Sequence, residues 1–138
     1  MSIAHSRRKS KGSAAERELI ARFWEVGWTA HRIAGSGSSQ HPSPDLIAGS
    51  KGRVLAIEVK ATNDEKKYFP RLEIDELNEY ASKTGVEAWV AMKFFRTPWL
   101  FLKTSDLEQT PSSYVLTKEL CEKKGCGFEQ LIILPSLQ

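Results

Sequence analysis

The sequence predicts one α/β domain, in which a central mixed β-sheet is flanked by α-helices. The chain has 138 residues, a length that suits a single domain. Hydrophobic residues make up 41% of it and charged residues 27%, which is the balance of a globular domain and excludes a coiled coil or a disordered chain. Segments of helical and of alternating periodicity follow one another, as expected where helices pack against a sheet.

The first predicted element is a helix. Ser13 and Glu16 form a capping box, in which each side chain binds a free backbone N–H of the other residue, so we expect the helix to begin there. Gly27 can end it, because glycine readily adopts the left-handed conformation of a helix cap. The face expected to be buried consists of Leu19, Ile20, Phe23 and Val26.

Three strands are predicted to follow this helix. Residues 28–33 alternate as a strand does, and residues 35–43 form a polar Gly/Ser loop on the surface. Residues 45–48 begin a second strand, and the Gly-Ser-Lys-Gly turn of residues 49–52 folds it back. Residues 53–61 form the clearest strand; since one of its faces is aliphatic throughout, we expect this strand to lie centrally in the sheet.

The second half of the chain predicts a helix at residues 73–83. Its inward residues are Ile74, Leu77 and Ala81, and Gly85 ends it. The remaining elements are expected as strands at residues 86–95, 99–103, 113–116 and 128–134 and a short helix at residues 117–124.

Several classes of protein are excluded by composition. No apolar run approaches the roughly 18 residues of a membrane helix, and no secretory signal is visible, so we expect a cytoplasmic protein without a membrane partner. Cys121 and Cys126 have no further cysteine or histidine near them in the sequence, which indicates reduced thiols and not a zinc site.

Positive charge is concentrated at the N-terminus. The whole chain carries a net charge of +3, whereas its first 17 residues hold five basic side chains against Glu16 alone. We therefore divide the chain into a flexible basic arm, residues 1–11, and a single domain, residues 12–138. Such an arm suits a polyanionic partner, DNA, RNA or an anionic membrane, and the alternative is a tail that only improves solubility.

Glu58 and Lys60 are candidate catalytic residues. They lie two residues apart on the predicted central strand, so both side chains point to one face about 7 Å apart. Burying these charges is costly unless they pair or hold an ion. The alternative is an ordinary salt bridge at a partly exposed strand end.

Asp45 opens the strand that the 49–52 turn folds against Glu58 and Lys60. Counted from a turn centre between residues 50 and 51, Asp45 is nearer the turn than Lys60 is, so a register shift or sheet twist is needed for convergence. If they converge, two carboxylates would suit Mg²⁺, which takes one or two carboxylates, waters and phosphate oxygens. Lys60 could then position a water or neutralise charge on a phosphate. Glu16 has a complete structural explanation in the capping box.

These residues resemble a known nuclease signature. Pro44-Asp45 and Glu58-Val59-Lys60 match the PD-(D/E)xK pattern of restriction-endonuclease-like nucleases. Their context is similar to that of archaeal Holliday junction resolvases, and the resemblance covers roughly residues 8–104. The similar segments are KGSAAERE at residues 11–18, RIAGS at 32–36, KF at 93–94 and WLFL at 99–102.

The resemblance implies a restriction-endonuclease-like core and a homodimer that resolves four-way DNA junctions by paired, symmetric phosphodiester hydrolysis in recombination and repair. It implies Mg²⁺ as the cofactor, with Mn²⁺ as a substitute, and names no protein partner. By the same resemblance the metal is held by Asp45, Glu58 and the main-chain oxygen of Val59. Lys60 assists the attacking water, and Glu16 is linked to the metal or holds a water.

The loop before Asp45 leaves one catalytic residue open. By the resemblance, Ser36 or Ser38 is a serine tied to activity, but the twelve residues 33–44 do not identify which one. His41 is given no role. The residues expected to contact DNA phosphates are Arg7, Arg8, Lys9, Lys11, Arg17, Arg32, Lys66 and Lys67. For Lys66 and Lys67 the alternative is a solvated turn.

A cluster of aromatic residues is a candidate dimer surface. Five aromatic residues fall within a short stretch: Trp89, Phe94, Phe95, Trp99 and Phe101. A hairpin buries only one face in its own core, so the other face could contact a second copy. The alternative is that all five belong to the core of the monomer.

Two other functions compete with junction resolution. The first is a PD-(D/E)xK nuclease that acts on duplex, flap or damaged DNA. The second is a junction-binding protein without catalysis, which the presence of all four candidate residues disfavours. An RNA-binding module is disfavoured because the strands lack base-stacking aromatic motifs.

Overall fold

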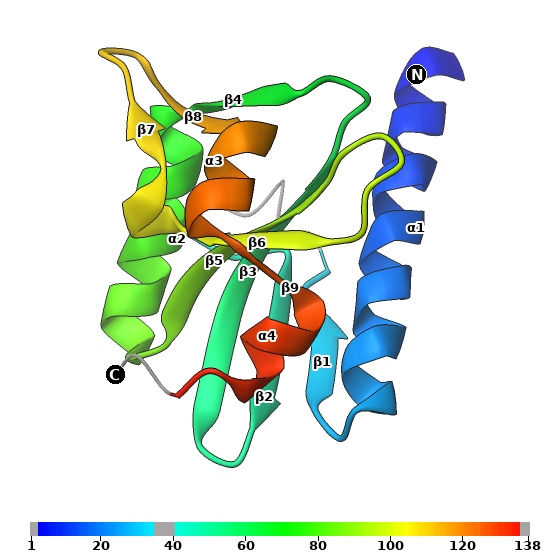
Figure 1. The fold of residues 1–138 in the computed structure, drawn as a ribbon, viewed down its shortest axis with the longest axis vertical. Helices are drawn as coiled ribbons and strands as arrows, with labels where there is room; N and C mark the ends of the chain where they lie inside the picture. Colours follow the sequence, from blue (N-terminus) through cyan, green and yellow to red (C-terminus); the bar gives the residue numbers. More distant parts are fainter. Residues whose placement is uncertain (1–2, 35–40, 136–138) are drawn as a thin grey trace.

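A six-stranded mixed sheet forms the centre of the molecule (Figure 1). The computed structural model describes residues 3–34 and 41–135, and side chains from residue 14 onward. Across the sheet, the strands are β1 (Thr29–Arg32), β2 (Leu46–Ser50), β3 (Arg53–Ala61), β5 (Glu87–Lys93), β6 (Leu100–Lys103) and β9 (Cys126–Gly127). β3 and β5 run parallel, and the other neighbouring pairs run antiparallel. Because β3 lies between β2 and β5, it is an interior strand, as predicted.

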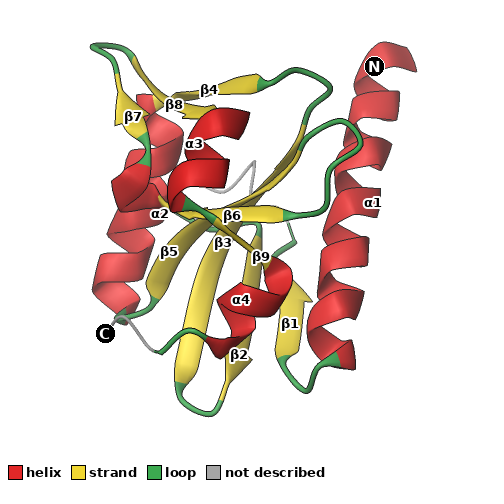
Figure 2. Cartoon of the chain, in the orientation of Figure 1, coloured by secondary structure: helices red, strands yellow, loops and turns green. Residues whose placement is uncertain are grey.

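Helices cover both faces of this sheet (Figure 2). The described residues form the α-helices α1 (Ile3–Glu25), α2 (Arg71–Thr84), α3 (Lys118–Lys124) and α4 (Phe128–Ile133). Leu19 and Phe23 of α1 and Phe128 of α4 pack in one core cluster, which includes the Leu55–Ile57–Val59 face of β3. Ile74 of α2 and Leu120 of α3 belong to a second cluster on the other face. The predicted α/β class is therefore confirmed.

A second sheet has three strands, of which the sequence predicts only the one at residues 113–116. It consists of β4 (Lys66–Pro70), β8 (Ser113–Thr117) and β7 (Glu108–Gln109), in that order. Figure 1 shows it at the end of the molecule away from the β2–β3 turn. The solvated-turn alternative for Lys66 and Lys67 is wrong, because these residues pair with β8. Their strand is hidden from local analysis since its partner lies far along the chain.

The first helix begins earlier than predicted. It starts at Ile3, so Ser13 lies inside the helix and the expected capping box at Ser13 and Glu16 is wrong. Residues 3–12 contain no proline and several strong helix formers, which allows the helix to extend in this direction. The helix ends as predicted, with Gly27 at a φ of 87°. Val26, expected in the core, is exposed.

The β2–β3 hairpin turn sets the register that matters for the site. Lys51 and Gly52 have φ angles of 46° and 86°, the positive values of a type I′ turn. Leu46 then pairs with Ile57, which places Asp45 beside Glu58 without any shift. The expected need for a register shift is wrong because the turn is centred one residue later than predicted.

The C-terminal segment is a helix and not the predicted strand. Only Cys126 and Gly127 pair with β6, and α4 begins at Phe128. Phe128 and Leu131 are both buried and lie three residues apart, which is a helical spacing. The β-branched and aromatic residues within 128–134 favour a strand locally and so obscure this spacing. This packing against the sheet outweighs local strand propensity.

Most of the aromatic cluster belongs to the core of the monomer. Trp89, Phe94, Trp99 and Phe101 are 0–3% exposed, whereas Phe95 is 57% exposed. Four of the five residues are therefore unavailable for the expected dimer surface, and the alternative that all five belong to the core is wrong for Phe95. Among residues 3–34 and 41–135, no helix combines the length and hydropathy needed to cross a membrane.

Candidate active site

Asp45 is attached to the end of the central strand by a hydrogen bond. It immediately precedes β2, and its Oδ2 accepts the backbone N–H of Val59 at 2.9 Å. This bond and the β2–β3 register together hold the Asp45 carboxylate at the C-terminal part of β3. Asp45 thus converges with the Glu58–Lys60 pair, a point that the sequence leaves open.

Glu58 and Lys60 lie side by side on β3, as the period of a strand predicts. Lys60 Nζ is 3.5 Å from Glu58 Oε1. The Glu58 side chain is 10% exposed and that of Lys60 31% exposed, so the pair sits at the border between core and solvent. A substrate can reach Lys60 there, while Glu58 is largely withdrawn from water.

Glu16 faces the same region from α1. Its Oε2 lies 2.7 Å from Arg32 Nε of β1, and its side chain is 14% exposed. The pKa of Glu16 is raised by burial and by the charge of Asp45, against the lowering effect of Arg32 and Lys60. Since the helix begins well before Ser13, Glu16 is no capping-box residue, and its structural explanation no longer holds.

Glu73 completes the cluster and was missing from the sequence prediction. It lies in the first turn of α2, and its Oε1 is 2.9 Å from Lys60 Nζ. It also shares a hydrogen bond with Glu58. No spacing or motif marks Glu73, because a different element brings it to the strand. The sequence marks Glu73 only as the first residue of a predicted helix.

The carboxyl groups of this cluster shift one another's ionisation. Burial raises the pKa of Glu58 well above its ordinary value, and the hydrogen bond to Glu73 and the charge of Asp45 raise it further. The carboxyl of Glu73 is buried as well, but its contact with Glu58 and the charge of Lys60 lower its pKa. Burial alone would lower the pKa of Lys60, but the charges of Glu73 and Glu58 outweigh it and raise the pKa.

The side chains suit a hard divalent cation in an open site. Within the described residues, no three Asp, Glu, His or Cys side chains form a ready-made metal cage. Mg²⁺ does not require one, since it commonly binds through one or two carboxylates and fills its other positions with water and phosphate oxygens. Asp45 and Glu58 provide two such carboxylates in mutual repulsion, which a cation would relieve.

Comparison with known proteins identifies the family. The model of the family described as archaeal Holliday junction resolvase (Hjc) matches residues 7–138. This chain belongs to the archaeal Holliday junction resolvase family. The resemblance found in the sequence is thereby confirmed, and with it the expected class of enzyme, a crossover junction endodeoxyribonuclease.

Relatives of the resolvase family match nearly the full length. The crossover junction endodeoxyribonuclease Hjc of Archaeoglobus fulgidus is 39% identical over 129 residues, which cover 88% of this chain and 95% of that protein. The Hjc of Sulfolobus acidocaldarius is 32% identical over 127 residues, or 90% of this chain and 87% of that protein. A 1.6 Å structure of Archaeoglobus fulgidus Hjc, 33% identical, superposes with a TM-score of 0.82 and covers 87% of this chain and 98% of the other.

The structure describes the side chains of four residues that are predicted to contact DNA phosphates, and two of them, Arg32 and Lys67, lie near the cluster. Arg32, expected at a DNA phosphate, forms an ion pair with Glu16 and keeps its side chain 49% exposed. Lys67 is close enough to Glu73 to lower its pKa, and Lys66 Nζ lies 5.7 Å from the ring centre of the exposed Tyr68. Arg17 is exposed on α1.

Other predicted residues fall outside the described part of the resolvase. Ser36 and Ser38 are among residues 35–40, which lie outside it. Arg7, Arg8, Lys9 and Lys11 belong to α1 by their backbone, but their side chains are not among those described. Their roles stay predictions.

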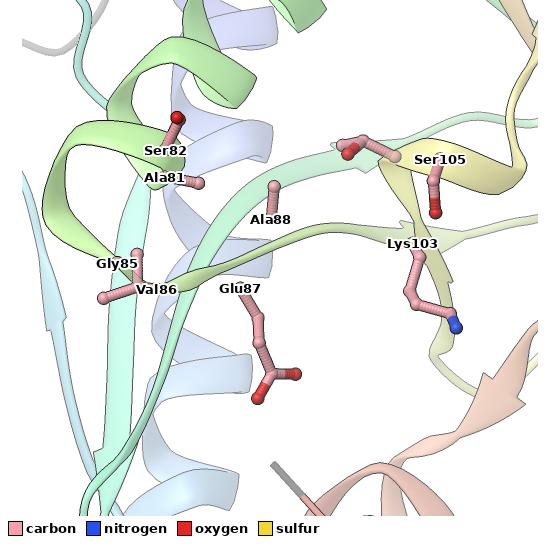
Figure 3. Close-up of a pocket in the computed structure, with 9 residues that line it drawn as sticks. Ala81, Ser82, Gly85, Val86, Glu87, Ala88, Lys103 and Ser105 are labelled. Carbon is pink, nitrogen blue, oxygen red and sulfur yellow. The ribbon is translucent and has the colours of Figure 1, made fainter. Parts of the chain in front are cut away.

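A cavity of about 420 Å³ lies elsewhere in the resolvase (Figure 3). It is lined by the end of α2, by Glu87 and Ala88 at the start of β5, and by Lys103. Glu87 pairs with Leu55, near the opposite end of β3 from Lys60. The residues that line the cavity therefore include none of Glu16, Asp45, Glu58 and Lys60.

Proposed function

We propose that this chain cuts four-way DNA junctions by hydrolysing phosphodiester bonds at the Glu16–Asp45–Glu58–Lys60 cluster. The observation that carries the proposal is the convergence of these four side chains at one end of β3, in a chain that belongs to the resolvase family. The proposed cofactor is Mg²⁺, which Mn²⁺ can replace. The enzyme would act as a homodimer on junction DNA in the cytoplasm.

Each residue of the cluster has a proposed task. Asp45 and Glu58 would hold the cation together with the main-chain oxygen of Val59, and Glu16 would bind the cation or one of its waters. When bound, such a cation activates water and neutralises charge on the phosphate. Lys60 holds its ammonium group at the solvent border, where it can orient the attacking water and stabilise the negative charge that develops on the phosphate.

Phosphate contacts fit a substrate without a fixed sequence. Arg17 and Arg32 from one side of the cluster and Lys66 and Lys67 from another are the proposed contacts near the site, and the basic arm of residues 1–11 extends them. Charges of this kind grip the sugar-phosphate backbone without reading bases. A homodimer with twofold symmetry would present two identical sites to a junction, which suits paired cuts.

A strand-labelled nuclease assay tests this function. The substrates are a four-way junction, a matched linear duplex and a flap, each incubated with Mg²⁺. We expect paired, symmetric nicks in the junction alone. Equal cutting of flap or duplex would instead make the chain a general nuclease of this fold, and tight junction binding without any cutting would indicate a non-catalytic binding protein.

The control variant is Asp45→Asn. Its side-chain oxygen can still accept the Val59 N–H bond, so the variant should fold and lose only the charge. We expect it to lose cleavage and to bind the junction about as well as the wild type. Parallel loss of binding and cleavage would show that Asp45 acts through structure.

A further inference from the structure

The first turn of α2 is held rigidly at the edge of the active site. Arg71 donates from Nη2 to the backbone oxygen of Thr110 at 2.8 Å and from Nε to that of Pro111 at 3.2 Å. One turn further on, Tyr114 Oη donates to Asp75 Oδ1 at 2.7 Å. The β7–β8 turn and β8 thus contact α2 on the two sides of Glu73.

This arrangement aims the Glu73 carboxylate at the catalytic lysine. Lys60 Nζ lies 2.9 Å from Glu73 Oε1 but 3.5 Å from Glu58 Oε1, so Glu73 is its shorter contact. The Glu73 side chain is 28% exposed and that of Lys60 31% exposed. The two side chains therefore do not form a buried ion pair of the core, and both face the site.

Lys60 needs a carboxylate partner that is not also a ligand of the cation. If Glu58 serves as a metal ligand, its oxygens are engaged and the cation repels the neighbouring ammonium group. Lys60 would then lose its partner on its own strand and swing toward solvent. Glu73 lies on another element, beyond the pair Asp45 and Glu58, and it can keep the ammonium group in place.

We propose that Glu73 is a positioning residue of the nuclease, which holds the Lys60 ammonium group against the scissile phosphate while Glu58 is engaged by the cation. This inference rests on the proposed function and extends it to a residue outside the PD-(D/E)xK signature. It also gives the small sheet a task, since the contacts at Arg71 and Asp75 orient the first turn that carries Glu73.

The first test compares three α2 variants. Glu73→Gln removes the charge at nearly constant size, Glu73→Asp keeps the charge but shortens its reach, and Glu76→Gln removes an exposed charge from the same helix. We measure single-turnover cutting of the junction in Mg²⁺ and junction affinity without the cation. Glu73→Gln should slow cutting by about ten-fold or more, the scale of a lost charge-assisted hydrogen bond, with affinity within about two-fold of the wild type. Glu73→Asp should retain part of the rate, and Glu76→Gln all of it.

A double-mutant cycle with Lys60→Met separates positioning from structure. If Glu73 acts through Lys60, adding Glu73→Gln to Lys60→Met should change the residual rate by less than about two-fold. Losses that multiply would overturn the proposal, as would Glu73→Gln cutting at the wild-type rate. Unfolding midpoints of all variants, measured by urea, show whether each is folded; if Glu73→Gln is not, Glu73→Asp carries the comparison.

Cation binding supplies a readout independent of cutting. Calorimetric titration of the protein with Mn²⁺ alone should give Glu73→Gln and wild type affinities within about three-fold of each other, because Glu73 contacts Lys60 and is not a proposed ligand. A loss of about ten-fold or more would make Glu73 a ligand and overturn the proposal. Failure of the proposed function itself looks different, because then the wild type and Asp45→Asn would be equally inactive on junctions.

Discussion

A buried ion pair far from the candidate active site should contribute a large part of the stability. Arg53 at the start of β3 donates from Nε and Nη2 to the two oxygens of Glu87 at 2.8 and 3.1 Å. Its Nη1 donates to the backbone oxygens of Leu131 and Leu134 at 2.6 and 3.0 Å. The two side chains are 8% and 3% exposed, so solvent screens this network little. It joins β3 and β5 to the C-terminal helix.

Replacing Arg53 by Met should destabilise the fold by about 4 kcal/mol. Removing one partner of a buried pair costs about 3–5 kcal/mol, because the other charge stays buried after losing its ion-pair partner. The Leu131 and Leu134 carbonyls also lose a donor, at about 1–3 kcal/mol for each one that water does not reach. Since a domain is stable by about 5–15 kcal/mol, Arg53→Met should shift the urea midpoint strongly. Tryptophan fluorescence can follow the unfolding, with four tryptophans in the chain.

Two comparisons sharpen this test. Lys83→Met breaks an exposed pair with Glu79, at 3.7 Å and with side chains 76% and 49% exposed, and should cost less than about 0.5 kcal/mol. Combining Arg53→Met with Glu87→Leu should recover stability over Arg53→Met alone, since no charge is then left buried. A cost below about 1 kcal/mol for Arg53→Met would refute the argument. The folded fraction should keep its cutting rate, because the pair lies at the other end of β3 from the site.

Two further predictions concern the C-terminal part of the fold. A Cβ at Gly125 would lie 2.6 Å from the backbone oxygens of Cys121 and Phe101. Gly125→Ala should therefore lower the free energy of unfolding in urea by about 1–3 kcal/mol. A Cβ at Gly127 would meet nothing within 4 Å, so Gly127→Ala should lower it by less than about 0.5 kcal/mol. Equal effects of the two substitutions would contradict the crowding argument. Burial raises the pKa of Cys121 to about 12 and also raises that of Cys126, so at pH 8 both thiols stay protonated and should react with a thiol reagent only after unfolding. Rapid labelling of the native protein at pH 8 would contradict this.

Local sequence signals predicted the elements whose cause is local. The period-two pattern of residues 53–61 corresponds to β3 residue for residue. The helix around Ile74, Leu77 and Ala81 forms with the predicted inward face, and Gly85 ends it at a φ of 77°. Thr117 caps α3, with its hydroxyl accepting the Leu120 N–H at 3.0 Å. In each case residues within one turn or one strand contain the whole signal.

Predictions failed where distant segments decide the structure. The strand at Lys66 exists because β8, far along the chain, pairs with it. The segment after Gly127 becomes a helix because Phe128 and Leu131 pack into the core cluster of the main sheet. The aromatic hairpin is covered by its own domain, a fact about packing that the pattern of aromatic residues does not contain.

The candidate active site divides in the same way. Sequence analysis alone placed Glu58 and Lys60 on one face of a strand, because alternation is a property of the backbone, and it placed Asp45 beyond a tight turn. The type I′ geometry at residues 51–52 decided the register that brings Asp45 to Glu58. Glu16 lies on α1 and Glu73 on α2, and the apolar residues of these helices belong to two different core clusters. The packing of the two helices against the sheet brings both carboxyl groups to the same end of β3. No local sequence signal encodes that packing.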